Sequence, residues 1–228
     1  MHFKLPKPLH GWREFVGEVG IIVLGVLIAL GAQQVVETRQ THQRIKETRA
    51  ALDAELSRNL AAFEWRVSQR PCLQSRVEEL DRWATATAAG RPVALRKEIT
   101  PPRYFALNKT VWQASQNDAG QMPVETKLNY ASIYAALGTL DENVFRDEQD
   151  AWDSISGYEQ NKDLTREELH IVRSAIIDLQ ADDELLDVFQ QRLGSQAAKL
   201  GIRPLPHIEK GIEAQLMQNN RELCERLL

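Results

Sequence analysis

Cysteine is nearly absent from this sequence, which contains only Cys72 and Cys224, far apart in the chain. No pair has CxxC spacing, so the common zinc and redox motifs are excluded. The chain also lacks the G-x-S-x-G turn of serine hydrolases, the phosphate loop G-x-x-x-x-G-K-[ST] and the dinucleotide motif G-x-G-x-x-G. Because these motifs are missing, the sequence predicts neither an enzyme nor a cofactor.

Blocks of basic residues are missing as well. The 228 residues carry a formal net charge of −4. The first 36 residues hold three basic and two acidic side chains, a contribution of +1, so the rest of the chain carries −5 with both signs interspersed. This pattern argues against nucleic acid as the main partner. The contents of 43% hydrophobic and 26% charged residues are those of a folded globular chain.

Metal-ligand patterns are scarce too. Glu167 and His170 have the i, i+3 spacing that places a carboxylate and an imidazole on one helix face, as in di-iron bundles. Such sites need a second pair and two further glutamates, and neither His42 nor His207 has a glutamate three residues before it. We therefore expect no metal site. Glu167 is better explained as a first-turn carboxylate favoured by the helix dipole.

One long hydrophobic run is present, within the stretch FVGEVGIIVLGVLIALGAQQ. Val19 to Ala32 is continuously apolar or glycine over 14 residues, and Phe15 to Val36 gives 22. A bilayer core needs about 20 helical residues. Trp12 and the polar segment 37–39 suit the two interfaces. The pattern predicts a short tail (1–14), a transmembrane helix (15–36) and a helical domain (37–228).

A cleaved signal peptide is the alternative. Lys4, Lys7 and Arg13 would form its basic region, and a small-residue site precedes Ala32. The acidic Glu18 and the lack of any break after the apolar run favour an uncleaved anchor instead. Basic residues near the two ends of the run balance, so the positive-inside rule does not orient it. A short tail before a large domain favours a cytoplasmic N-terminus and an exported domain.

One face of the apolar segment carries an unusual set of side chains. Steps of 4, 3, 4 and 4 residues place on that face Glu18, Ile22, Gly25, Ala29 and Gln33. Small residues let membrane helices approach closely, and intramembrane polar groups usually face protein. The spacing therefore predicts a contact face with another helix. The alternative is that Glu18 lies near the interface and reaches the lipid headgroups.

The stretch GWREFVGEVGIIVLGVLIALGAQQVVE, residues 11–37, resembles the opening of a family of uncharacterised bacterial single-anchor membrane proteins. That family shares a signature of the type W-R-x-F-x-G-E-x-x-I-V-x-G-V-L-I-A-L. Looser similarities are a cysteine after the first long helix, a Trp segment such as 111–114, and a cysteine near the end. The resemblance implies one anchor in the bacterial inner membrane and a helical periplasmic domain, and it implies no activity.

The rest of the chain has helical periodicity and no alternating strand pattern. Pro71 and Gly90 delimit a second helix, residues 91–109 are irregular, and Thr165 begins a capping box. The apolar stripes expected to face a core are Ile45, Leu52, Leu56, Leu60, Phe63 and Val67; Leu73, Val77, Leu80 and Trp83; Leu128, Ile133, Leu137, Leu140, Val144, Trp152 and Ile155; Leu169, Val172, Ile176, Leu179, Leu186, Phe189 and Leu193; and Ile208, Ile212, Leu216, Leu223 and Leu227. We expect a turn at 118–120. The prediction is an all-α bundle on a helical stalk.

Cys72 begins the second helix and Cys224 lies near the end of the last one. An antiparallel bundle can bring these ends together, so we predict a disulfide between them. Two separate buried thiols are the alternative. A disulfide would also favour a domain outside the cytoplasm.

Function is the least determined property of the sequence. Trp112, Gln113, Asn117 and Asp118, beside the loop 103–105, could line a ligand pocket, but aromatic packing with polar caps and turns is the favoured interpretation. The leading hypothesis is a membrane-anchored domain that binds or scaffolds another envelope protein or a second copy of itself. The alternative is a ligand-sensing domain that acts through a separate membrane partner.

Overall fold

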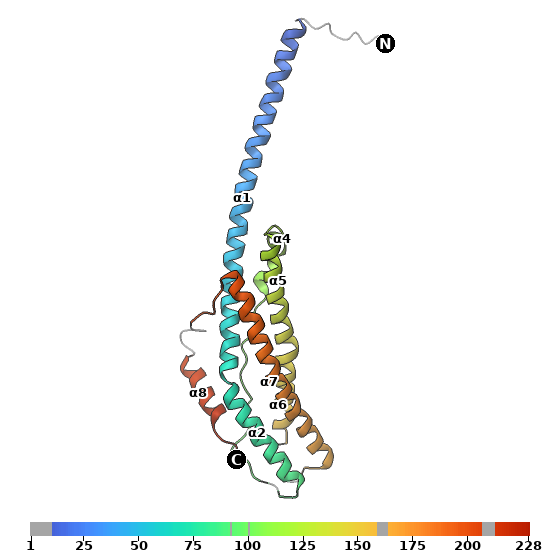
Figure 1. Ribbon diagram of the computed structural model, residues 1–228, viewed down its shortest axis with the longest axis vertical. Helices are drawn as coiled ribbons and strands as arrows, with labels where there is room; N and C mark the ends of the chain where they lie inside the picture. Colours follow the sequence, from blue (N-terminus) through green and yellow to red (C-terminus); the bar gives the residue numbers. More distant parts are fainter. Residues whose placement is uncertain (1–10, 92, 100, 159–163, 207–212) are drawn as a thin grey trace, which may run out of the picture. The chain divides into compact units, whose positions relative to one another are not determined.

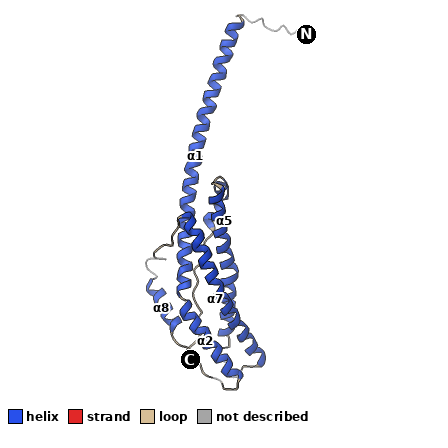
Figure 2. Ribbon diagram, viewed as in Figure 1, coloured by secondary structure: helices blue, strands red, loops and turns tan. Residues whose placement is uncertain are grey.

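The computed structural model describes residues 11–91, 93–99, 101–158, 164–206 and 213–228. Throughout these residues the regular structure is helical and no strand occurs (Figure 2). The all-α prediction is confirmed. The chain divides into two compact units, Met1–Thr48 and Arg49–Leu228. The first helix, α1 (Trp12–Ser68), contributes residues to both units.

The first unit contains the apolar part of α1. In the described part of the chain, one helix is long and apolar enough to cross a membrane, judged by length and composition, and its candidate span begins at Phe15. No part of its most apolar window is buried. Large side chains such as Ile21 and Leu27 are 74% and 60% exposed. The apolar surface of this segment therefore has no protein cover within one chain.

The second unit is a bundle built around two long helices. Its elements after α1 are α2 (Arg70–Ala88), α3 (Thr110–Ala114), α4 (Gln116–Gly120), α5 (Val124–Thr139), the π-helical turn η1 (Leu140–Val144), α6 (Phe145–Ser156), α7 (Arg166–Leu200) and α8 (Glu213–Cys224). Helix α7 lies alongside α2, α5 and α6 (Figure 1). It therefore contributes to the packing of most of the bundle.

Local sequence signals fix several helix ends. Pro71 lies in the first turn of α2, where its missing N–H costs nothing. Thr165 begins α7 with a capping box, in which its hydroxyl accepts from the Glu168 N–H and its own N–H donates to the Glu168 carboxylate at 2.7 Å. Gly201 ends α7 at a φ of 73°, in the left-handed region where a side chain would be strained.

The core of the second unit contains most of the predicted apolar stripes. Leu52, Leu56, Leu60 and Phe63 of α1 are all buried. A second cluster joins α2, α6, α7 and the C-terminal segment. Its large members include Leu80, Trp83, Trp152, Ile155, Val172, Ile176, Leu223 and Leu227. Burial of these side chains is the main stabilising term of the bundle.

Three expectations differ from the structure. Leu128 is 59% exposed because it lies on the side of α5 opposite Ile133 and Leu137, which are fully buried. The expected turn at 118–120 is part of the short helix α4, in which Ala119 is buried. The helix expected to run on to Ile155 is continuous, but it departs from a regular α-helix at η1, whose wider turn inserts an extra residue into the helical repeat. Two further core positions, Ile208 and Ile212, lie outside the described residues.

Candidate functional site

The predicted contact face lies on the unburied part of α1. Its residues, Glu18, Ile22, Gly25, Ala29 and Gln33, are all exposed. A Cβ added at Gly25 would meet no atom within 4 Å, so the single chain offers this face nothing to pack against. The Gln33 amide donates to the Glu37 carboxylate at 2.7 Å, one turn further along the helix. The face is thus available, and its use as a contact remains a prediction.

The two cysteines are joined. Cys72 in the first turn of α2 and Cys224 at the end of α8 form a disulfide, with their Cα atoms 4.6 Å apart and a sequence separation of 152 positions. The predicted pairing is confirmed.

Polar contacts hold the same C-terminal segment. The Leu227 N–H donates to the Glu79 carboxylate at 2.6 Å, and the Leu227 carbonyl accepts from the Arg96 N–H at 2.8 Å. Lys97 reaches the Glu222 carbonyl at 2.6 Å and the Glu225 carboxylate at 2.8 Å. The disulfide is therefore one part of a larger attachment of this segment to α2 and the loop after it.

The aromatic loop residues pack as the favoured interpretation expects. Trp112 stacks on Tyr134 with ring centroids 5.0 Å apart, whereas Gln113 and Asn117 are exposed. The buried Glu55 carboxylate accepts from the Val111 N–H at 2.9 Å, the Trp112 N–H at 3.3 Å and the Tyr134 hydroxyl at 2.7 Å. Glu55 therefore has a structural role, because its carboxylate caps backbone N–H groups at the start of α3.

A buried ion pair lies between α1 and α6. Arg66 and Glu148 are each 3% exposed. The Nε and Nη2 groups of Arg66 donate hydrogen bonds to the two carboxylate oxygens of Glu148. The guanidinium also lies over the Tyr104 ring, 5.8 Å from its centroid, and burial raises the pKa of the Tyr104 hydroxyl. Removing one partner of such a pair would leave the other charge buried and unpaired, at a cost of about 3–5 kcal/mol.

The cleft beside this pair measures about 590 Å³ and is crossed by a second ion-pair network. Arg70 binds Asp183 through two bonds of 2.8 and 2.9 Å and also binds Asp187. Burial acts to raise the pKa of Asp183, but hydrogen bonds from Arg70 and Gln74 outweigh it and hold that pKa below its ordinary value. Three of the five carboxylates that line this cleft, those of Glu148, Asp183 and Asp187, are thus paired with Arg66 or Arg70.

A second cavity, of about 650 Å³, lies between α6 and α7 and is acidic. It contains Asp147 and Asp150 from α6, and Asp178 and Asp182 from α7. Burial, followed by repulsion from Glu148, Asp147 and Asp178, raises the pKa of Asp182 to about 7. We call this cavity, with those four aspartates, the acidic groove. Nothing in the sequence marks these residues, because they come together only when α6 and α7 pack.

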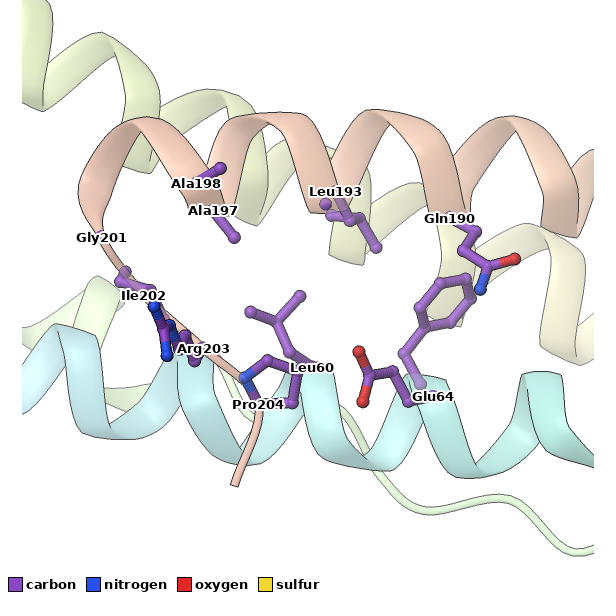
Figure 3. A pocket seen from close by; sticks show the side chains of 12 residues that line it. Leu60, Glu64, Gln190, Leu193, Ala197, Ala198, Gly201, Ile202, Arg203 and Pro204 are labelled. Atoms are coloured by element: carbon purple, nitrogen blue, oxygen red, sulfur yellow. The ribbon is translucent and has the colours of Figure 1, made fainter. Parts of the chain in front are cut away.

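A third pocket, of about 320 Å³, lies between α1 and the C-terminal part of α7 (Figure 3). Leu60, Phe63, Leu193 and Ile202 give it apolar walls. Figure 3 shows the Glu64 carboxylate between the two helices, and burial raises its pKa. This pocket has an apolar character and a single inward carboxylate, in contrast to the acidic groove.

Comparisons of the chain with protein-family models, with curated proteins and with solved structures find no match.

Proposed function

We propose that this protein is a single-pass protein of the bacterial inner membrane whose helical domain binds or scaffolds another envelope protein or a second copy of itself. The observation that carries the proposal is the uncovered apolar part of α1. In water, each Å² of such surface is unfavourable by about 25 cal/mol. The hydrocarbon core of a bilayer, which about 20 helical residues span, removes that penalty.

The disulfide supports the orientation of this anchor. Structural disulfides persist in oxidising compartments and are rare in the cytosol. A bond between Cys72 and Cys224 therefore favours a periplasmic domain and a cytoplasmic N-terminus. This reasoning is independent of the basic residues around the span, which balance.

The contact face supports binding within the membrane. Gly25 and Ala29 leave room for the backbone of a second helix, and Glu18 and Gln33 supply polar groups at the two ends of the face. A lipid-facing position would leave these polar groups poorly solvated. The proposed occupant is a transmembrane helix of an envelope protein or of a second copy.

Anchoring and orientation are tested on the full chain with a C-terminal tag. The tagged protein should stay in the membrane during carbonate extraction and retain Met1. External protease should remove the tag in spheroplasts and leave it intact in whole cells. A soluble product that starts near Ala32 would identify a signal peptide instead, and a tag protected in spheroplasts would place the domain in the cytoplasm.

The alternative function, ligand sensing through a separate membrane partner, is favoured by a different observation. The acidic groove offers four carboxylates to one cavity of about 650 Å³.

A further inference from the structure

The acidic groove is formed where α6 and α7 pack in opposite directions. Ser154 lines it together with His170 near one end, and Asp147 lines it together with Asp182 near the other. Its lining includes the buried Ala151 and Ala175 and the exposed Ala181, whose small side chains leave the space open. Among the described residues, no lysine or arginine lines it. The groove therefore combines negative charge with small apolar side chains.

The four carboxylates of the groove lack close cationic partners in the part of the chain that the structure describes. In the described residues, no ion pair or side-chain hydrogen bond involves the carboxylate of Asp147, Asp150, Asp178 or Asp182. The neighbouring cleft is different, because there Arg70 binds Asp183 and Asp187. Two carboxylates of the cleft thus have a cationic partner, whereas the four carboxylates of the groove form no ion pair among the described residues.

Asp182 gives an independent indication of a ligand. Its side chain is 8% exposed, it lines the groove, and its Oδ2 atom is buried without any hydrogen-bond partner. A buried carboxylate oxygen without a partner is unfavourable by about 1–3 kcal/mol or more. A cation in the groove would reduce that penalty by attracting the carboxylate charge.

Within the described residues, the carboxylates of the groove are not gathered in a way that could hold a metal ion. Within the described part of the chain, no group of three or more His, Cys, Asp or Glu side chains is placed to hold a metal ion. Asp147 and Asp150 are separated by about 4.5 Å along α6, and Asp178 and Asp182 by about 6 Å along α7, from the helical rise of about 1.5 Å per residue. The negative charge is therefore spread along the groove.

We propose that the acidic groove binds a linear organic diammonium ion. Its two ammonium groups lie among the carboxylates of Asp147, Asp150, Asp178 and Asp182, and its methylene chain lies against the alanine side chains of the lining. Ammonium groups donate three hydrogen bonds each and suit several acceptors at once. This inference goes beyond the proposed anchoring and partner binding, since the groove lies entirely within residues 147–182 and needs no second protein.

The test is calorimetric titration of the full chain, in non-ionic detergent at low salt, with putrescine as the probe. We expect one-to-one binding that weakens as salt screens the charges. Butylamine, which has a similar methylene chain and one charge, should bind much more weakly. Equal heats for the two amines, no heat with putrescine, or equally tight binding of Mg²⁺ would overturn the proposal.

Matched variants locate the site. Asp178→Asn should weaken putrescine binding about fivefold, the upper range for one solvent-accessible ion pair. The control is Asp153→Asn on α6, which removes an exposed carboxylate outside the groove and should leave binding unchanged. An equal effect of the two variants would show non-specific attraction. If a lysine-rich helical peptide binds at the groove and putrescine does not, the ligand is a basic protein partner and the proposed diammonium ion is wrong. Loss of membrane anchoring would leave these binding results unaffected.

Discussion

Replacing Asp182 by asparagine should stabilise the helical domain at pH 8 and much less at pH 5. The folded chain holds the pKa of Asp182 at about 7, against an ordinary value of 3.8. Between these values the unfolded chain has released the proton and the folded chain retains it, so the free energy of unfolding falls as the pH rises. The loss is complete above pH 7, and asparagine, which has no charge to bury, avoids it.

The magnitude follows from the pKa difference. At about 1.4 kcal/mol per pKa unit, the full shift corresponds to a ceiling of about 4 kcal/mol. Water in the adjoining groove screens the carboxylate, so we expect a gain of about 1–2 kcal/mol at pH 8. At pH 5, ionisation of Asp182 in the unfolded chain has lowered the free energy of unfolding by only part of its full amount. The gain from Asp182→Asn should therefore fall to about a third of its value at pH 8.

Urea unfolding of the detergent-solubilised chain, followed by circular dichroism at pH 5 and pH 8, measures both gains. Asp153→Asn is the control, because its exposed carboxylate lies on α6 outside the groove, and it should change the free energy of unfolding by less than about 0.5 kcal/mol. If the gain in unfolding free energy for Asp182→Asn is equal at the two pH values, the raised pKa of Asp182 is refuted. Destabilisation at pH 8 would show that the carboxylate forms a favourable contact.

Two further predictions concern the anchor and the disulfide. Gly25→Leu should weaken an oligomer or partner complex in mild detergent by blocking close helix approach, whereas Val26→Leu, off the contact face, should not. If cross-linking yields the same amount of complex for the two variants, the contact face is refuted and Glu18 lies at the lipid interface instead. Cys72→Ser, Cys224→Ser and the double variant should each lose about 2–5 kcal/mol of unfolding free energy, since each removes the same bond. Non-reducing mass spectrometry should find the two cysteines in one linked peptide pair, and free alkylation of native protein without reductant would contradict the bond.

Helix ends were predictable where a single residue determines them. Pro71 cannot donate a backbone hydrogen bond, Thr165 has the matching glutamate three residues on, and Gly90 adopts a left-handed φ of 69° just after α2. The disulfide was predictable because only two cysteines exist. These features depend on local chemistry or on counting, and both are visible in a sequence.

The acidic groove and the ion pairs were not predictable for the opposite reason. Asp147 and Asp178 stay exposed in the folded chain and line one groove only because α6 and α7 pack, and Arg66 meets Glu148 across 82 positions in the sequence. Leu128 was misassigned because helical spacing alone does not say which of two apolar faces meets the core. The extra residue of η1 changes the helical phase between α5 and α6, and no proline or glycine in Leu140–Val144 announces it.

The bond between Cys72 and Cys224 closes most of the helical domain into a covalent ring. Any single cut of the backbone between these residues opens the ring and releases no fragment, because both pieces remain tied through sulfur. Within the ring, the described residues 93–99 and 101–109 form no helix, and Arg96 and Lys97 attach this part to the C-terminal segment. A nicked molecule thus keeps its full mass, and two cuts, or one cut and a reductant, are needed before any part of the domain can leave.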